Sequence, residues 1–163
     1  MELLYILLVS FSNYFLSLPF TIFGLTKFGP NDITAYWQPS GYVFGIVWSI
    51  MYLCLGLINF KSFIFAEYNR DLCFSIITQG LIESIIQTLW LLVTSNFNNG
   101  RHPLQHFFGF FIIYKLVDLA WNRRGKFLYK FDRVGFYLYL PYMIWIAFAM
   151  ILNLQILYKI YLV

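Results

Sequence analysis

Charged residues are scarce in this sequence. Only 11% of its 163 residues are Asp, Glu, Lys or Arg, whereas roughly 25% is typical of a soluble domain. So few charges cannot cover the surface of a water-soluble protein of this size. The composition therefore excludes an ordinary soluble enzyme and a disordered polar chain, and it favours a protein embedded in a lipid bilayer.

Cysteine and histidine are also rare, which limits the disulfide and metal chemistry open to the chain. Cys54 and Cys73 lie in or beside apolar stretches, so we predict buried thiols rather than a disulfide framework. His102 and His106 are four residues apart, but Pro103 lies between them and no third His or Cys completes a site. We therefore predict neither a metal nor a cofactor.

Acidic residues are fewer than basic ones, and the formal net charge is +4. Basic residues concentrate in one short stretch between apolar segments, and they do not interleave with aromatic residues as in a nucleic-acid groove. We expect this stretch to be a juxtamembrane loop attracted to anionic lipid headgroups. Its basic residues are Arg123, Arg124, Lys126, Lys130 and Arg133.

Apolar and aromatic residues are abundant, at 61% and 23% of the chain. A membrane-spanning helix needs roughly 20 apolar residues, and short loops between such helices predict antiparallel neighbours in one bundle. The predicted fold class is all-α, an integral membrane bundle of five transmembrane helices in a single domain, residues 1–163. The predicted spans are residues 2–25, 40–66, 72–94, 103–121 and 134–158.

The ends of these spans differ in charge. The side that holds the amino terminus collects seven basic residues and the opposite side three. The positive-inside rule then predicts that the amino terminus lies in the cytosol. Pro19 is expected to kink the first span near one end.

Polar residues recur on one face of two predicted spans. A polar side chain on a spanning helix normally faces the protein interior, because exposure to hydrocarbon is costly. Interhelical hydrogen bonds could explain single positions, whereas a whole stripe favours a polar-walled cavity. The stripe of the first span is Ser10, Asn13 and Ser17. The stripe of the third span is Gln79, Glu83, Gln87, Trp90 and Thr94.

Aromatic residues form a second pattern. Trp37, at the entrance of the second predicted span, is spaced to share one helix face with Phe44, Trp48 and Tyr52. Small residues beside them permit close helix approach. Trp48, Trp90 and Trp145 lie in three different spans, each on a face predicted to point inward. Aromatic rings beside small residues suit a large, flat, apolar ligand.

Three ionisable residues lie inside predicted spans: Glu83, Lys115 and Asp118. Lys115 and Asp118 are three residues apart and are expected to neutralise each other. A buried Glu83 requires either protonation or a cationic partner such as Lys115. We hypothesise that Glu83 makes ligand binding depend on pH.

Two motifs resemble the translocator protein family, also called tryptophan-rich sensory protein or peripheral-type benzodiazepine receptor. The first follows the family pattern Trp-x-Pro-Pro, then Phe-x-x-Val-Trp-x-x-Leu-Tyr and Gly, and comprises Trp37, Pro39, Phe44, Val47, Trp48, Tyr52 and Gly56. The second follows Pro-Tyr-x-x-Trp-x-x-Phe-Ala and Leu-Asn, and comprises Pro141, Tyr142, Trp145, Phe148, Ala149, Leu152 and Asn153. Ser40 replaces the second Pro, Glu83 stands at a Gln position and Gln87 at an Asn position.

This resemblance implies a five-helix bundle, often a homodimer, that binds porphyrins, haem-like tetrapyrroles or sterols among its helices. It implies a multi-pass protein of the mitochondrial outer membrane or of a bacterial membrane. The expected ligand-binding residues are Trp37, Phe44, Trp48, Tyr52, Glu83, Gln87, Trp90, Pro141, Trp145, Phe148 and Ala149.

Two alternative functions stay open at this point. The first is light-dependent porphyrin degradation, for which the resemblance implies Trp48 and Trp145 as the catalytic residues. The second is a small proton-coupled transporter that uses Glu83, Lys115 and Asp118, although the sequence lacks the internal repeats typical of such proteins.

Overall fold

The computed structural model describes residues 2–23, 33–94 and 103–162, and these residues form helices and connecting segments without a strand. The all-α prediction is therefore confirmed. The α-helices are α1 (Glu2–Ser10), α2 (Ser12–Ile22), α3 (Gly41–Ile64), α4 (Arg70–Thr94), α5 (Pro103–Leu119), α6 (Lys126–Phe131) and α7 (Arg133–Leu162). A π-helical segment, η1 (Ala120–Gly125), joins α5 to α6.

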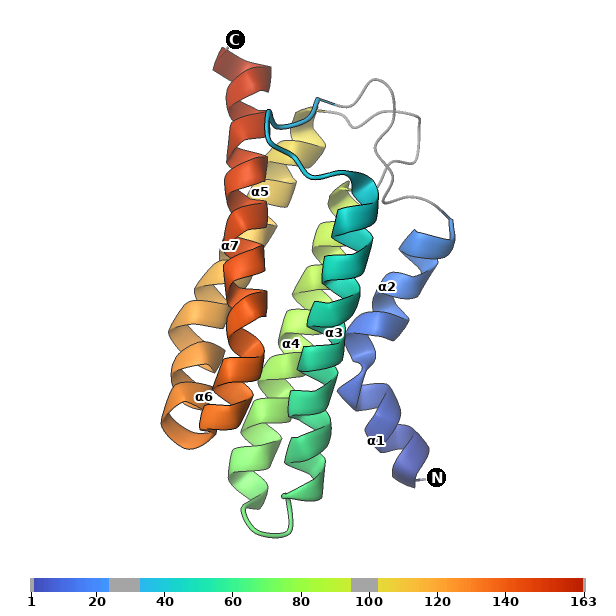
Figure 1. Cartoon of the computed structure of the whole chain (residues 1–163), viewed down its shortest axis with the longest axis vertical. Coiled ribbons are helices and arrows are strands. Elements are labelled where there is room, and N and C mark those ends of the chain that lie inside the picture. Colours follow the sequence, from blue (N-terminus) through green and yellow to red (C-terminus); the bar gives the residue numbers. More distant parts are fainter. Residues whose placement is uncertain (1, 24–32, 95–102, 163) are drawn as a thin grey trace.

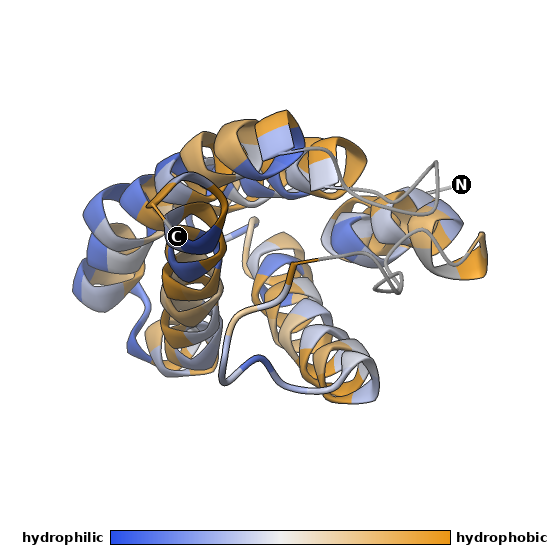
Figure 2. Ribbon diagram, turned by 90° about the horizontal axis from the view of Figure 1, so that it is seen from above, coloured by the Kyte–Doolittle hydropathy of each residue, from blue (hydrophilic) through white to orange (hydrophobic). Residues whose placement is uncertain are grey.

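The long helices run side by side along one axis (Figure 1). Helix α7 packs against α3 and α5, and α4 packs against α3 and α5. Helices α1 and α2 lie at one side of the bundle, where α1 contacts α3 and α2 contacts α4. The amino and carboxyl termini lie at opposite ends of the molecule (Figure 1). The view along the axis shows the helices arranged around one another rather than in a flat layer (Figure 2).

Within the described residues, α3, α4 and α7 are long and apolar enough to cross a membrane, and α1 with α2 makes a fourth candidate as one bent span. The chain bends by 61° between α1 and α2. The break lies at Phe11 and not at Pro19, which lies inside α2 and leaves it helical. A Cβ atom at Gly56 of α3 would overlap the Phe11 ring, so the bend is packed directly against α3.

The fourth predicted span differs more from the structure. Helix α5 has only 17 residues, but the chain stays helical through η1 and α6 as far as Phe131. The stretch that the sequence predicted as a basic loop is therefore mostly helical. Its charges end the apolar run without ending the helix, because Arg and Lys are good helix formers. The helical path bends back at Asp132, which precedes α7.

The bundle is apolar on the outside and partly polar inside. Large apolar side chains such as Ile46, Phe74 and Ile144 are exposed. The interior combines fully buried apolar residues with buried polar side chains, namely Ser10, Ser12, Asn13, Asn59, Ser62, Glu83, Ser84, Gln87, His106, Arg124 and Asn153. This distribution is typical of a protein surrounded by lipid, because hydrocarbon accepts apolar surface and excludes polar groups.

Candidate functional site

Trp48 lies at the centre of a cluster of aromatic rings from three helices. Its ring centroid is 5.5 Å from Tyr52, 6.2 Å from Trp90, 6.3 Å from Tyr142 and 6.3 Å from Trp145. These five residues, contributed by α3, α4 and α7, are called the Trp48 cluster below. The structure thus brings together the three tryptophans that the helix faces predicted to point inward.

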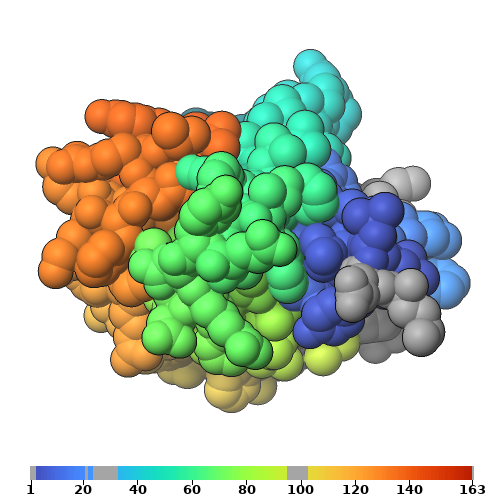
Figure 3. All heavy atoms as spheres, turned by 90° about the horizontal axis from the view of Figure 1, so that it is seen from below, coloured from blue at the N-terminus to red at the C-terminus, as the bar shows by residue number. Residues whose placement is uncertain are grey.

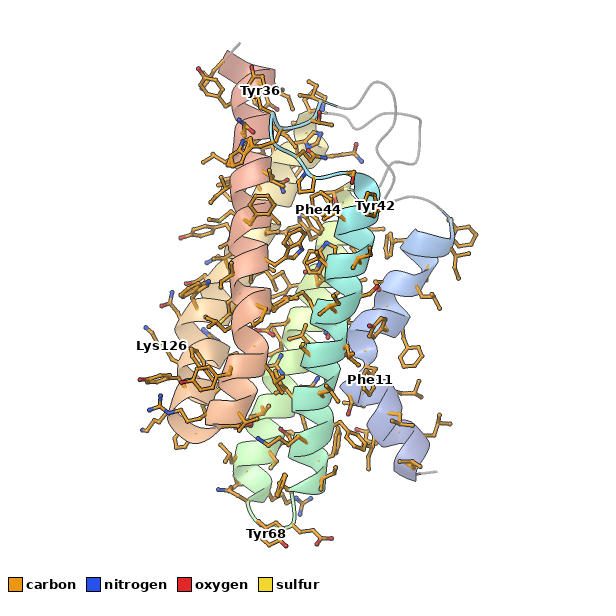
Figure 4. The ribbon with its side chains drawn as sticks, viewed as in Figure 1. Phe11, Tyr36, Tyr42, Phe44, Tyr68 and Lys126 are labelled. Atoms are coloured by element: carbon orange, nitrogen blue, oxygen red, sulfur yellow. The ribbon has the colours of Figure 1, made fainter. Side chains whose placement is uncertain are left out.

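Further aromatic residues extend the cluster towards the start of α3. The Trp145 ring lies 5.4 Å from Phe44 and 5.4 Å from Phe148, and Phe148 lies 6.1 Å from Trp37. The Phe44 side chain projects into the space between α3 and α7 (Figure 4). Trp37 is 51% exposed and lies before α3, so it does not share a helix face with Phe44 as predicted.

The segment before α3 is held against α7. The Tyr36 backbone N–H donates to the Gln155 side-chain oxygen at 3.1 Å, and Lys159 Nζ donates to the Thr34 carbonyl at 2.8 Å. Lys159 Nζ also lies 3.5 Å from the centre of the Tyr36 ring, which is labelled beside α7 in Figure 4. These contacts position Trp37 next to Phe148.

Several buried polar atoms around the Trp48 cluster have no hydrogen bond of normal geometry within the described part of the chain. They are Nε1 of Trp90, Nε1 of Trp145, the hydroxyl of Tyr142 and both amide atoms of Gln87. Gln87 is 2% exposed and lies on α4 one turn before Trp90. Buried polar groups in native proteins nearly always have a partner, so these atoms are exceptions among the described residues.

A charged cluster lies on the α6 side of the aromatic rings. Arg124 donates from one nitrogen to a Glu83 carboxylate oxygen at 2.7 Å and from another to Asn59 Oδ1 at 2.7 Å. The Tyr139 hydroxyl donates to the other Glu83 oxygen. Arg124 is 1% exposed and Glu83 is 2% exposed, so the ion pair is buried. Glu83, Arg124, Asn59 and Tyr139 are called the Glu83 cluster below.

The Glu83 cluster corrects two predictions. Arg124 does not belong to an exposed basic loop, because η1 turns its side chain into the bundle. The cationic partner of Glu83 is Arg124 and not Lys115, which is exposed near the Tyr114 ring. Since both carboxylate oxygens are already bonded, Glu83 is less available to a ligand than its place on the polar stripe indicated. Tyr139 and Tyr142 link the two clusters, with ring centroids 5.4 Å apart.

The remaining predicted residues occupy different environments. Ala149 is 3% exposed, whereas Pro141 is exposed on α7. Asp118 accepts a hydrogen bond from Asn122 at 2.8 Å, and no ion pair joins it to Lys115 among the described residues. Among the described residues, no ion pair joins Glu83, Lys115 and Asp118 to one another.

The described residues contain no group of three or more His, Cys, Asp or Glu side chains that could hold a metal ion. His106 is buried in α5, and His102 lies outside the described residues. Cys54 and Cys73 are free thiols.

Sequence reasoning missed four residues of these clusters. Tyr142 lies three residues before Trp145 and Tyr139 three residues before Tyr142, so each successive pair shares a helix face. Asn59 lies seven residues after Tyr52, again on one face. Arg124 offered no such signal, because it follows the end of the apolar run.

Comparison with known proteins gives one match. A model of the TspO/MBR family matches residues 31–159 of the chain. This range contains all five residues of the Trp48 cluster and all four of the Glu83 cluster. No curated protein and no solved structure matches the chain significantly.

Proposed function

Because the chain belongs to the TspO/MBR family of membrane proteins, as its two motifs predicted, we propose that it binds a flat, apolar ligand within the membrane. The proposed ligand class is the porphyrins and related tetrapyrroles, with sterols as the alternative. The proposed site is the Trp48 cluster, in a single domain of five spans that includes α5. A homodimer, which the resemblance implies, remains a prediction.

The Trp48 cluster is the observation that carries this proposal. Rings from α3, α4 and α7 surround Trp48 at centroid distances of 5.5 to 6.3 Å. Indole and phenol rings offer large apolar faces together with a polar edge, which suits an extended aromatic ligand. Phe44 and Phe148 continue the apolar lining towards Trp37.

The polar atoms favour a porphyrin over a sterol. The Trp90 and Trp145 indoles, the Gln87 amide and the Tyr142 hydroxyl are donors without a partner of normal geometry in the described residues. A porphyrin carries ring nitrogens and, in protoporphyrin IX, two carboxylates that can accept such bonds. A sterol offers one hydroxyl, which would leave most of these buried donors unpaired at a cost of about 1–3 kcal/mol each.

Titration of the purified protein with protoporphyrin IX in the dark tests the proposal. We expect a Soret shift and quenching of tryptophan fluorescence on binding. Trp48→Ala should weaken binding about tenfold or more, because loss of one aromatic contact in a buried site costs at least about 1.4 kcal/mol. Gln87→Leu should weaken binding of the porphyrin while leaving the aromatic walls in place.

Trp121→Phe is the matched control, since Trp121 is exposed on η1 and lies outside the Trp48 cluster. The proposal fails if Trp48→Ala binds protoporphyrin IX as tightly as Trp121→Phe does. Illumination of the same samples distinguishes binding from protein-dependent degradation, because only degradation by the protein bleaches the Soret band faster than in free protoporphyrin IX. Bleaching that persists in Trp48→Phe and Trp145→Phe would contradict a catalytic role for these residues.

A further inference from the structure

Basic side chains surround α6 at one end of the bundle. Arg123, Lys126, Lys130 and Arg133 are exposed, whereas Arg124 between them points into the Glu83 cluster. Lys126 projects away from the helices in Figure 4. Figure 3 views this end of the molecule, where α6 and the start of α7 form a lobe beside the α3–α4 connection. The structure therefore separates the buried arginine from an exposed basic surface.

Aromatic rings are interspersed among these basic groups. Trp121 is 43% exposed, and Tyr129 and Phe131 are each 50% exposed. The Arg133 guanidinium lies 3.7 Å from the centre of the Tyr129 ring, and Lys130 Nζ lies 4.9 Å from the centre of Phe131. These aromatic rings attract the Arg133 and Lys130 side chains and hold them in place, but they do not cancel the positive charges. These seven residues, Trp121, Arg123, Lys126, Tyr129, Lys130, Phe131 and Arg133, are called the α6 surface below.

The nearby acidic residues leave this charge uncompensated. Asp132 pairs with Lys61 and accepts a hydrogen bond from the Gly135 backbone at 3.0 Å. Asp118 accepts from Asn122. Among the described residues, no ion pair involves the four exposed basic side chains of the α6 surface. The α6 surface thus carries a net positive charge that is exposed at the end of the bundle.

We propose that the α6 surface docks anionic phospholipid headgroups. Lys and Arg near a bilayer surface are attracted to anionic lipids, and Trp and Tyr prefer the membrane–water interface. The α6 surface combines both features at the end of a bundle whose sides are apolar. Its neighbours Val134 and Tyr137 on α7 are 61% and 65% exposed, so an acyl chain below a bound headgroup would meet apolar surface. This inference depends on the protein being in a membrane and not on its proposed ligand.

Native mass spectrometry of the full-length protein in detergent tests this inference. The probes are dihexanoyl phosphatidylglycerol, dihexanoyl phosphatidylcholine and inorganic phosphate. We expect phosphatidylglycerol to bind more tightly than phosphatidylcholine, and the preference to decrease with salt. Lys126→Gln/Lys130→Gln should weaken phosphatidylglycerol binding about 25-fold, at about fivefold for each lost charge. Lys126→Arg/Lys130→Arg should retain it.

Arg70→Gln is the matched control, because Arg70 is an exposed basic residue outside the α6 surface. The inference is overturned if Lys126→Gln/Lys130→Gln keeps its phosphatidylglycerol affinity, or if Arg70→Gln loses as much. Binding of inorganic phosphate with equal affinity would also overturn it, since the surface would then recognise a free anion and not a lipid.

Discussion

Arg124 and Glu83 form an ion pair inside a membrane bundle, where an unpaired charge is very costly. Two of the Arg124 nitrogens and both Glu83 oxygens have partners, through Asn59 and Tyr139. The four side chains come from α3, α4, η1 and α7, so the pair connects four separate elements. The contribution of this ion pair to the stability of the fold therefore depends on both Glu83 and Arg124 being present.

Arg124→Met should be strongly destabilising, because it leaves the Glu83 carboxylate buried without its cation. Breaking a buried pair in this way costs about 3–5 kcal/mol. The double variant Glu83→Gln/Arg124→Met removes both charges and should be more stable than Arg124→Met. Thermal unfolding of the variants in detergent measures both differences.

Lys61→Met is the control, since the Lys61–Asp132 pair is partly exposed, with 34% and 13% of the two side chains accessible. A pair of this kind contributes roughly 0–1 kcal/mol. If Arg124→Met were no less stable than Lys61→Met, the assigned role of the buried pair would be wrong.

At the scale of the elements, the bend between α1 and α2 depends on a close approach to α3. The Phe11 side chain lies at the break (Figure 4), against the Gly56 backbone. Ser12 of α2 also shares a hydrogen bond with Ser84 of α4 at 2.9 Å. A side chain larger than hydrogen at position 56 would therefore push the bent pair away from the bundle.

Gly56→Ala should destabilise the protein by about 1–3 kcal/mol, the usual cost of overpacking a filled site. Gly45→Ala is the matched control in the same helix, because nothing lies within 4 Å of a Cβ atom there. Since Ala is a better helix former than Gly, Gly45→Ala should be neutral or slightly stabilising. Thermal unfolding that ranks the two variants in the opposite order would contradict this packing.

At the scale of the whole molecule, the proposed fifth span requires α5 to cross the membrane. Helix α5 is 17 residues long, but α5 and η1 together form a continuous helical stretch from Pro103 to Gly125. If this stretch spans the bilayer, α6 lies on the same side as the connection between α3 and α4. Figure 3 shows α6 beside that connection, so α6 on the opposite side of the membrane would contradict the structure.

Labelling with a membrane-impermeant maleimide distinguishes these topologies. The variants Tyr36→Cys, Tyr68→Cys and Tyr129→Cys are made in a chain without its native cysteines, and all three tyrosines are exposed. We expect Tyr68→Cys and Tyr129→Cys to be labelled from the cytosolic side and Tyr36→Cys from the other. Labelling of Tyr129→Cys from the same side of the membrane as Tyr36→Cys would contradict a fifth span.

Much of this protein could be predicted from local sequence patterns. Low charge and long apolar runs predicted an all-helical membrane protein, because the bilayer requires satisfied backbone groups and apolar surfaces. The spacing of Trp48, Trp90 and Trp145 predicted three inward faces, and the ring distances confirm that they meet. The motifs around Trp48 and Trp145 predicted the family, which the match over residues 31–159 confirms.

Other features were decided only by the tertiary structure. The partner of Glu83 is separated from it by 41 residues, and helical spacing contains no information on such a contact. Arg124 follows the apolar run, so its burial depends on η1 turning it towards Glu83. The break at Phe11 likewise depends on Gly56, which lies in another helix. Periodicity within a helix determines which face turns inward, whereas the packing of helices determines which side chains meet there.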